Sequence, residues 1–457
     1  MKTAIVGVLS ALLVGVTGGV STAAGPGPLS PPLSKISADP FTDPISQHET
    51  SVEPDSFAYG QTIVAASMAG RFFSGGGADG IGWATSLDGG DTWQQGFLPN
   101  LTTSNGGSLD RATDPVVAYD AAHGTWLISI SGVIFGASSV RTFVTVSRSD
   151  DGLHWSDPIV VAELDNDKEW IVCDNGVQSP FRGNCYLEWT TFSPNRTQLS
   201  VSRDGGATWG PVQIPVNPRA EIAGQPLVQP NGTVIMPLVD WSADNSVQVL
   251  RSVDGGVTWK GGPTGVRIKH RDTPYIRGGH SQFVSAEIDG SGKVFVAWSD
   301  CRFRKNCSSN DIVFATTVDG VHWSAVRRVP IDGLSSNLDH LIPGIGVDTG
   351  TSGAGAHIGL AFYQVQAGCA FADCRLQGAF ISSVDGGASW SAPVPIGSQA
   401  RLEWIADTTG GRFVGDYIST SFTSDGRAHP VASIGLEPAG SEFNQAIFTP
   451  TGGLPVS

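Results

Sequence analysis

The chain carries six copies of one short segment, and this repetition constrains its fold more than any other feature. Four copies read Ser-x-Asp-Gly-Gly-x-(Thr/Ser)-Trp, and two are one residue shorter with His before the Trp. They span residues 86–93, 149–155, 202–209, 252–259, 317–323 and 383–390. The Asp side chain can cap turn amides, the Gly supplies positive φ, and the Trp anchors the returning strand. Each copy therefore predicts a tight hairpin.

The spacing of the copies predicts a repeated four-stranded unit. Their Trp residues stand at positions 93, 155, 209, 259, 323 and 390, with intervals of 50 to 67 residues. After the last copy, three strand-like runs at residues 413–422, 429–434 and 444–449 lack a fourth strand, which we expect residues 36–44 to supply. We predict an all-β, single-domain β-propeller of seven four-stranded blades, with six as the alternative. The repeated turns would join the third and fourth strands.

The N-terminal segment has the pattern of a secretory signal. Residues 1–24 hold Lys2, an apolar run and small residues ending Thr-Ala-Ala. We expect a leader and ring-closing strand over residues 25–44 and the propeller over residues 45–457. The six cysteines fall as neighbours, which predicts the disulfides of an oxidising compartment. The expected pairs are Cys173 with Cys185, Cys301 with Cys307, and Cys369 with Cys374. The mature protein is expected to be secreted.

The charge of the chain bounds its partners. The formal net charge is −15, which argues against nucleic acid or an anionic membrane as a partner. We expect a soluble monomer.

The six segments are identified as Asp-boxes, or bacterial neuraminidase repeats, so the chain resembles the sialidase superfamily of β-propellers. In that superfamily the active site lies on the face opposite the Asp-boxes. That face is built by residues at which inner strands begin and second strands end. Such positions predict candidates at inner-strand starts, namely Asp114, Asp167, His280, Asp339, His340, Asp416 and Tyr417. They also predict four aromatic candidates at second-strand ends, Trp189, Trp241, Trp298 and Tyr363.

One basic window stands out on this acidic chain. Residues 267–305 hold eight Lys and Arg and four Asp and Glu, a balance of 8 − 4 = +4. Arg302 and Arg304 lie in the loop between Cys301 and Cys307. Arginine can hold a carboxylate in bidentate fashion, which makes these two residues candidate substrate contacts. The alternative is a solvated basic loop paired with neighbouring acids.

The resemblance implies roles for several of these residues. Sialidases use three arginines on the substrate carboxylate, a Tyr nucleophile helped by a Glu, and an Asp as acid/base. By position, Asp114 or Asp339 would be the acid/base, Tyr417 the nucleophile, and Arg302, Arg304 and Arg412 the clamp. The family's Phe/Tyr-Arg-Ile-Pro motif has no match, because residues 51–58 read SVEPDSFA.

Three functions remain open from the sequence. The first is an exo-glycosidase acting on an acidic glycan terminus. The second is a polysaccharide lyase, in which His280, His340 or Tyr417 abstracts a proton beside the arginines. The third is a non-catalytic glycan- or protein-binding propeller. We expect no required cofactor; the alternative is calcium held by Asp167 and Asp416. The aromatic candidates equally fit burial between blades, and the aspartates fit loop capping.

Overall fold

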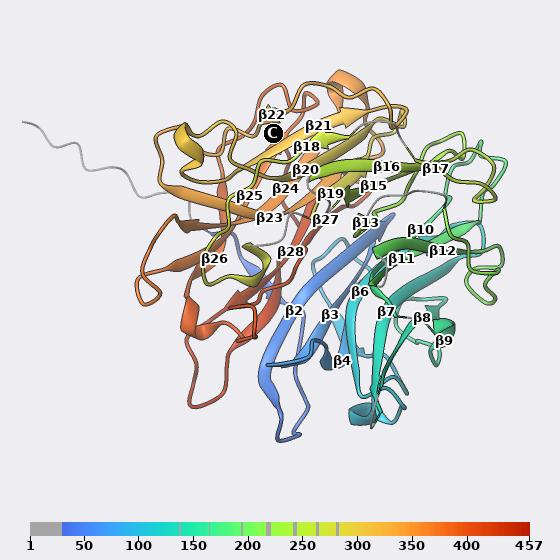
Figure 1. Cartoon of the computed structure of the whole chain (residues 1–457), viewed down its shortest axis with the longest axis horizontal. Coiled ribbons are helices and arrows are strands. Elements are labelled where there is room, and N and C mark those ends of the chain that lie inside the picture. The colour runs from blue at the N-terminus through green and yellow to red at the C-terminus, as the bar shows by residue number, and fades with distance from the viewer. Residues whose placement is uncertain are drawn as a thin grey trace, which may run out of the picture.

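The computed structural model describes residues 30–136, 139–163, 165–192, 195–215, 221–240, 245–261, 265–279 and 283–457. The predicted signal at residues 1–24, Trp241 and His280 lie outside the described residues. Hydrogen bonds join the described strands into five sheets, of twelve, three, six, four and four strands. Figure 1 shows these sheets arranged around the middle of the molecule. The architecture is nearly all β and is consistent with the expected sialidase-like β-propeller.

The strands repeat an antiparallel meander along the chain. The first half comprises β1 (Leu33–Lys35), β2 (Ser46–Tyr59), β3 (Thr62–Phe72), β4 (Ala78–Ser86), β5 (Gln94–Phe97), β6 (Arg111–Asp120), β7 (Thr125–Phe135), β8 (Val140–Ser149), β9 (Ile159–Glu163), β10 (Asp167–Cys173), β11 (Cys185–Phe192), β12 (Asn195–Ser202), β13 (Glu221–Ile222) and β14 (Leu227–Val228).

The second half comprises β15 (Val234–Asp240), β16 (Ser246–Ser252), β17 (Lys260–Gly261), β18 (Val266–Arg267), β19 (Ser285–Ile288), β20 (Val294–Asp300), β21 (Asp311–Thr317), β22 (Arg327–Arg328), β23 (Leu338–Val347), β24 (Ile358–Gln366), β25 (Arg375–Ser383), β26 (Val394–Arg401), β27 (Ser419–Phe422), β28 (Ala428–Gly435) and β29 (Gln445–Pro450). Single 3-10 turns are η1 (Thr103–Asn105), η2 (Arg277–Gly279), η3 (Lys305–Cys307), η4 (Gly353–Gly355) and η5 (Leu402–Trp404). No helix within the described part of the chain is long and apolar enough to cross a bilayer.

The strands nearest the middle of the molecule contact one another in a cycle. We call β2, β6, β10, β14, β19, β23 and β27 the inner strands. Each contacts the next, and β27 contacts β2, so the cycle returns to its start. In Figure 1 the blue strand β2 accordingly lies beside the red strand β28. The middle of the molecule is therefore bordered by residues from both ends of the chain.

The two ends of the chain also share a ladder. Strand β1 pairs antiparallel with β29, with Ser34 opposite Thr449, and the Ile36 amide donates to the Ile447 carbonyl at 2.9 Å. The sequence placed this pairing within residues 36–44, whereas the ladder falls on Leu33–Lys35. Of the predicted segment, Ile36 and Ser37 still bond to Ile447 of β29, and further along Phe41 packs edge-on against Phe97 instead.

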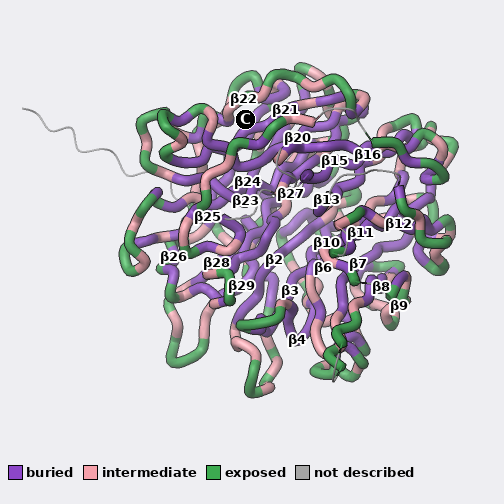
Figure 2. Tube along the Cα trace, in the orientation of Figure 1, coloured by how far each residue is buried: buried purple, intermediate pink, exposed green. Residues whose placement is uncertain are grey.

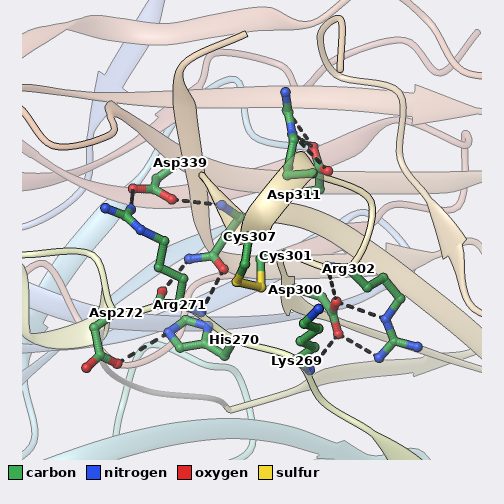
Figure 3. The surroundings of a disulfide bond; sticks show 12 residues. Lys269, His270, Arg271, Asp272, Asp300, Cys301, Arg302, Cys307, Asp311 and Asp339 are labelled. Carbon is green, nitrogen blue, oxygen red and sulfur yellow. Dashed lines mark hydrogen bonds and ion pairs between the residues drawn. A yellow bond between two sulfur atoms is a disulfide. The ribbon is translucent and has the colours of Figure 1, made fainter. Parts of the chain in front are cut away.

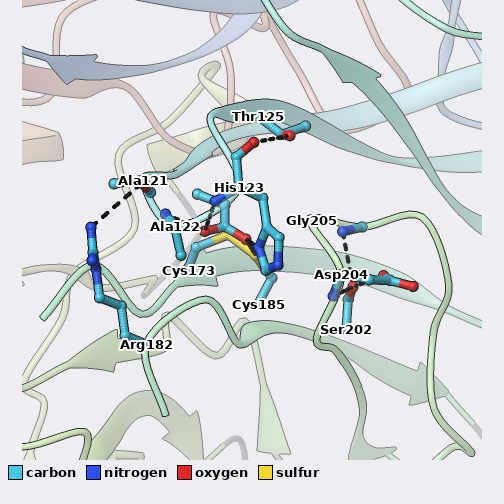
Figure 4. Close-up of polar contacts among 12 residues, drawn as sticks. Ala121, Ala122, His123, Thr125, Cys173, Arg182, Cys185, Ser202, Asp204 and Gly205 are labelled. Carbon is cyan, nitrogen blue, oxygen red and sulfur yellow. Dashed lines mark hydrogen bonds and ion pairs between the residues drawn. A yellow bond between two sulfur atoms is a disulfide. The ribbon is translucent and has the colours of Figure 1, made fainter. Parts of the chain in front are cut away.

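The repeated segments form turns with one hydrogen-bond pattern. In the first, the Gly90 amide donates to Ser86 Oγ at 2.8 Å, and the Thr92 amide donates to Asp88 Oδ1 at 2.9 Å. The glycine-to-hydroxyl bond recurs in the other five, at 2.8 to 3.0 Å. Figure 4 shows the turn that contains Asp204 beside the β6–β7 turn at His123. The repeated turns and the ends of the inner strands thus share one face, which we call the turn face. The opposite face, where inner strands begin, is the start face.

The core is divided between neighbouring sheets. One buried cluster joins Val116 and Leu127 of one meander to Ile171, Leu187 and Trp189 of the next. Figure 2 shows buried strands through the interior and exposed loops around the rim. The three predicted disulfides are confirmed: Cys173–Cys185, Cys301–Cys307 and Cys369–Cys374. These bridges hold short loops onto the sheets.

Candidate functional site

The inner strands are interrupted by residues with left-handed backbone. Glu53, Asp114 and Lys168 have φ of 57°, 54° and 55°, and each stands at a register irregularity of its strand. Ala223, Ile342 and Gly415 take positive φ near the corresponding point of other meanders. This conformation is costly for residues other than glycine, and such strain is found where the surroundings impose it.

Three of these irregularities bring charged side chains together. Lys168 Nζ lies 3.0 Å from Glu53 Oε1, 2.5 Å from Asp114 Oδ1 and 2.9 Å from Asp416 Oδ2. The four side chains are at most 7% exposed. We call these four residues the lysine cluster. It joins β2, β6, β10 and the segment before β27, so each residue comes from a different meander.

Two arginines and an aromatic ring border the cluster. Arg277 of η2 lies 3.5 Å from Asp416, and its side chain is 36% exposed. The Phe413 ring contacts both guanidinium groups, with its centroid 4.6 Å from Arg277 and 5.1 Å from buried Arg71. Contact with an aromatic face stabilises a cation. Arg277 therefore gives the cluster a cationic side chain that reaches solvent.

Burial and neighbouring charges give the carboxyl groups of the site different pKa values. Burial and the neighbouring Asp114 carboxylate raise the pKa of Asp167 to about 8, although Lys168 opposes the shift. Burial also raises the pKa of Glu53 to about 7. For Asp416, burial opposes ionisation, but Lys168 and Arg277 outweigh it and lower the pKa. At neutral pH the Asp167 carboxyl group is therefore protonated and the Asp416 carboxyl group is ionised, a difference expected of an acid/base pair.

Asp114 and Asp167 lie in contact at the start face. A side-chain hydrogen bond joins them, and it contributes to the raised pKa of Asp167. Asp167 is partly exposed at the first position of β10, whereas Asp114 is buried against Lys168. Asp167 is also close enough to Arg277 to help raise the pKa of that guanidinium, against the effect of burial. A proton donor and a cation thus stand together beside solvent.

Tyr417 lies against the lysine cluster, and it is not positioned to act as a nucleophile. Its hydroxyl donates to the Pro115 carbonyl at 3.0 Å, and its ring meets Trp170 edge-on at 5.3 Å. Burial, with Glu53 and Asp114 nearby, raises its pKa well above the ordinary value. The cavity beside Tyr417 is only about 20 Å³. A tyrosinate nucleophile would need the reverse electrostatic setting.

The candidate calcium ligands, Asp167 and Asp416, already lie beside the ammonium group of Lys168. The ammonium of Lys168 stands among Glu53, Asp114 and Asp416, where a metal ion would stand. A calcium ion bound by Asp416 and Asp167 would also lie beside Arg277. The donor set therefore does not fit a metal ion.

The predicted arginine contacts are paired with local acids. Arg302 donates to both oxygens of Asp300, at 2.9 and 2.7 Å, as Figure 3 shows. Trp298 is fully buried, and its indole nitrogen donates to the same carboxylate at 2.9 Å. Arg304 is buried and bonds to Asp311 at 2.6 Å. Both arginines pair with nearby acids, as the alternative interpretation expects, although Arg304 is buried rather than solvated, and we do not place either in the site.

Other candidates lie apart from the lysine cluster. Asp339 accepts from Arg271 at 2.9 Å (Figure 3). His340 is buried against Phe362, 5.7 Å between ring centroids, and pairs through Nδ1 with the Asn310 carbonyl. Of three further candidates, Trp189 and Tyr363 are buried, whereas Arg412 is partly exposed and its carbonyl accepts from the Arg277 amide at 2.9 Å. Trp189 is fully buried, Tyr363 donates to the Ser433 carbonyl at 2.8 Å, and Arg412 donates to the Ile405 carbonyl at 2.9 Å.

The structure thus brings Asp114, Asp167, Asp416 and Tyr417 together and adds residues that the sequence analysis did not select. Glu53, Lys168 and Arg277 complete the site. A signal for one of them is visible in hindsight: Glu53, like Asp114, directly precedes a proline within an inner strand.

Comparisons with known proteins end at the level of fold. No family model matches the chain, and no curated protein matches its sequence. A protein of unknown function from Dyadobacter fermentans aligns over 77% of this chain and 99% of its own, with 15% identity and a TM-score of 0.47. Trypanosoma rangeli sialidase, in complex with sialic acid, aligns over 74% of this chain and 57% of its own, with 14% identity and a TM-score of 0.47. The F. plautii N-acetylgalactosamine deacetylase, in complex with blood group B trisaccharide, aligns over 61% of this chain and 87% of its own, with 14% identity and a TM-score of 0.41.

Proposed function

We propose that this chain is a glycoside hydrolase acting on an anionic sugar at a glycan terminus. The observation that carries the proposal is the Asp114–Asp167 pair beside Lys168 and Arg277. A hydrolase of this type needs a carboxylic acid that keeps its proton at neutral pH and a second carboxyl group nearby. It also needs a cation to hold an anionic substrate.

The residues divide the work as follows. Asp167 gives its proton to the oxygen of the scissile bond as the carbon–oxygen bond breaks. Water adds to the anomeric carbon and returns a proton to the carboxyl pair. Asp114, 2.5 Å from Lys168, is the second carboxyl group of the pair and stabilises the positive charge that develops on the sugar ring. Arg277 contacts the carboxylate of the substrate.

The finer architecture is part of the proposal. Seven blades, each contributing one inner strand, are supported by the cycle of inner-strand contacts. The β1–β29 ladder would complete the last blade. Asp-boxes as the repeated turns are supported by their common hydrogen bonds. We also propose export after residue 24 and function as an extracellular monomer without a metal cofactor, with the three disulfides as support.

The lyase alternative has less support. Of its candidate bases, His340 pairs with the Asn310 carbonyl, the Tyr417 hydroxyl donates to the Pro115 carbonyl, and His280 lies outside the described residues. The binding alternative is kept as an outcome of the test.

The test is hydrolysis of sialic acid- and uronic acid-terminated glycans in heavy-oxygen water, followed by mass spectrometry. We expect a released sugar that carries the heavy oxygen, with unchanged yield in a calcium chelator. Asp167→Asn should lower turnover by about a hundredfold or more, because it removes the proton donor. Asp373→Asn is the matched control, since this exposed aspartate is far along the chain from the pair.

An unsaturated product without the heavy oxygen would make the protein a lyase. No product from any substrate would leave a binding propeller. Equal turnover by Asp167→Asn and the control would remove Asp167 from the mechanism.

A further inference from the structure

A second cavity lies at the ends of the inner strands, away from the lysine cluster. It has a volume of about 370 Å³ and is lined by the last residues of β2, β6, β10, β14 and β19. Trp170 and Tyr417, in edge contact at 5.3 Å, lie between this cavity and the cluster. Val177, which lines it, is 76% exposed and marks its mouth. The cavity therefore opens toward the turn face and has the size of a small-molecule site.

Two acidic side chains from opposite sides of the ring line this cavity. Asp55 of β2 accepts a hydrogen bond from the Val117 amide at 2.8 Å, which fixes one carboxyl oxygen. Glu287 of β19 forms no ion pair within the described part of the chain. Most other lining residues are apolar, among them Ile171, Leu227 and Ile288.

Asp55 and Glu287 have no compensating cation beside them among the described residues. Within that part of the chain, no Lys, Arg or His lines the cavity. Its other acidic residue, Asp289, is committed to its own turn, where it accepts from the Ser291 and Lys293 amides. Burial raises the pKa of Asp55 to about 7. Burial and then Asp55 raise the pKa of Glu287 to about 8. An unpaired carboxylate in an apolar cavity is stabilised most by a cation that enters from outside.

We propose that this cavity binds a small organic ammonium ion, with Glu287 and Asp55 as the anionic contacts and the apolar wall around its hydrocarbon part. A hard divalent cation is less suited, because it needs six or more oxygen ligands at close range and the wall is mostly apolar. The proposal concerns the turn face and is independent of the hydrolase proposed for the start face.

The test compares two probes of matched shape, 2-phenylethylamine and its neutral counterpart 2-phenylethanol. Binding to the full-length mature protein is measured by ligand-observed NMR and by calorimetry. We expect the amine to bind and the alcohol to bind at least about tenfold more weakly, because a charge-assisted contact is lost. Affinity for the amine should rise from pH 6 to pH 8, since Glu287 must lose its proton before it pairs with the ammonium.

Glu287→Gln keeps the shape of the side chain and removes its charge. This substitution should weaken binding of the amine by about tenfold and abolish the rise of its affinity with pH. Glu442→Gln, at an exposed glutamate, is the matched control and should change neither. A thermal melt of each variant reports folding.

Equal binding of the two probes, no amine binding, or amine binding that survives Glu287→Gln would overturn the proposal. Calcium that binds tightly, displaces the amine and is lost in Glu287→Gln would assign the acidic pair to a metal ion instead. None of these results bears on whether the protein hydrolyses glycans, so this proposal and the proposed function can fail separately.

Discussion

At the scale of single residues, Lys168 holds the candidate site together. Its ammonium bonds three buried carboxylates that come from separate meanders, and it takes a left-handed backbone to do so. Burying one charge is expensive, and the expense is offset only when its partners are close and well oriented. The same residue holds Asp114, at 2.5 Å, beside the proton donor Asp167. Structure and proposed chemistry therefore depend on one side chain.

Replacing Lys168 tests this role. Lys168→Met leaves the carboxyl groups of Glu53, Asp114 and Asp416 without their cation, so the free energy of unfolding at pH 7 should fall by about 3 to 5 kcal/mol. The loss should shrink as the pH is lowered, because the carboxyl groups then take up protons. Chemical denaturation measures both effects.

Lys260→Met, at an exposed lysine of β17, is the control and should be nearly neutral. A loss below about 1 kcal/mol for Lys168→Met would mean that the cluster is solvated rather than buried.

At the scale of elements, the repeated turns are the most uniform part of the molecule. In the turn over residues 202–209, Asp204 accepts from the Thr208 amide at 2.9 Å and from the Thr208 hydroxyl at 2.6 Å. These bonds are local, and the sequence alone predicts such turns. The disulfides were predictable for the same reason, since each joins near neighbours.

Removing one turn aspartate should have a modest, local effect. Asp204→Ala deletes both bonds to Thr208, and we expect a loss of about 1 kcal/mol in the free energy of unfolding. Hydrogen exchange should rise at the Thr208 amide and stay unchanged in the turn at residues 86–93. Asp373→Ala serves as the control. Loss of protection from hydrogen exchange across several sheets would show instead that the stability of the whole ring depends on this one turn.

The arrangement of the site was less predictable than its elements. Position along the chain was enough to select Asp114, Asp167, Asp416 and Tyr417, because they mark the starts of inner strands. Lys168 and Glu53 escaped selection, since their meeting depends on strand irregularities and on packing across the ring. Arg302 and Arg304 were selected for their charge, but acids two and seven residues away bind them. Pairing with a nearby acid decides whether a basic loop is available to a ligand.

At the scale of the whole molecule, the cycle of inner strands brings distant residues to one axis. Glu53 and Asp416 are 363 residues apart, yet the Asp416 amide donates to the Glu53 carboxylate at 3.2 Å. Bridges between neighbouring inner strands repeat around the ring: Gln225 accepts from the Ala286 amide at 2.7 Å and Ser285 from the Ile345 amide at 3.0 Å. The axis thus carries an ion cluster toward the start face and an acidic cavity toward the turn face.

The proposed mechanism requires Asp167 to keep its proton at neutral pH, because burial, and then the neighbouring Asp114, raise its pKa. The most direct measurement is the carboxyl carbon resonance of Asp167, followed by NMR as a function of pH and assigned with Asp167→Asn. The groups facing it are Asp114, Lys168, Asp416 and Arg277. We expect a carboxyl group that is protonated at pH 7 and titrates near pH 8. A carboxyl that ionises at about pH 4, as an ordinary aspartate does, would contradict it.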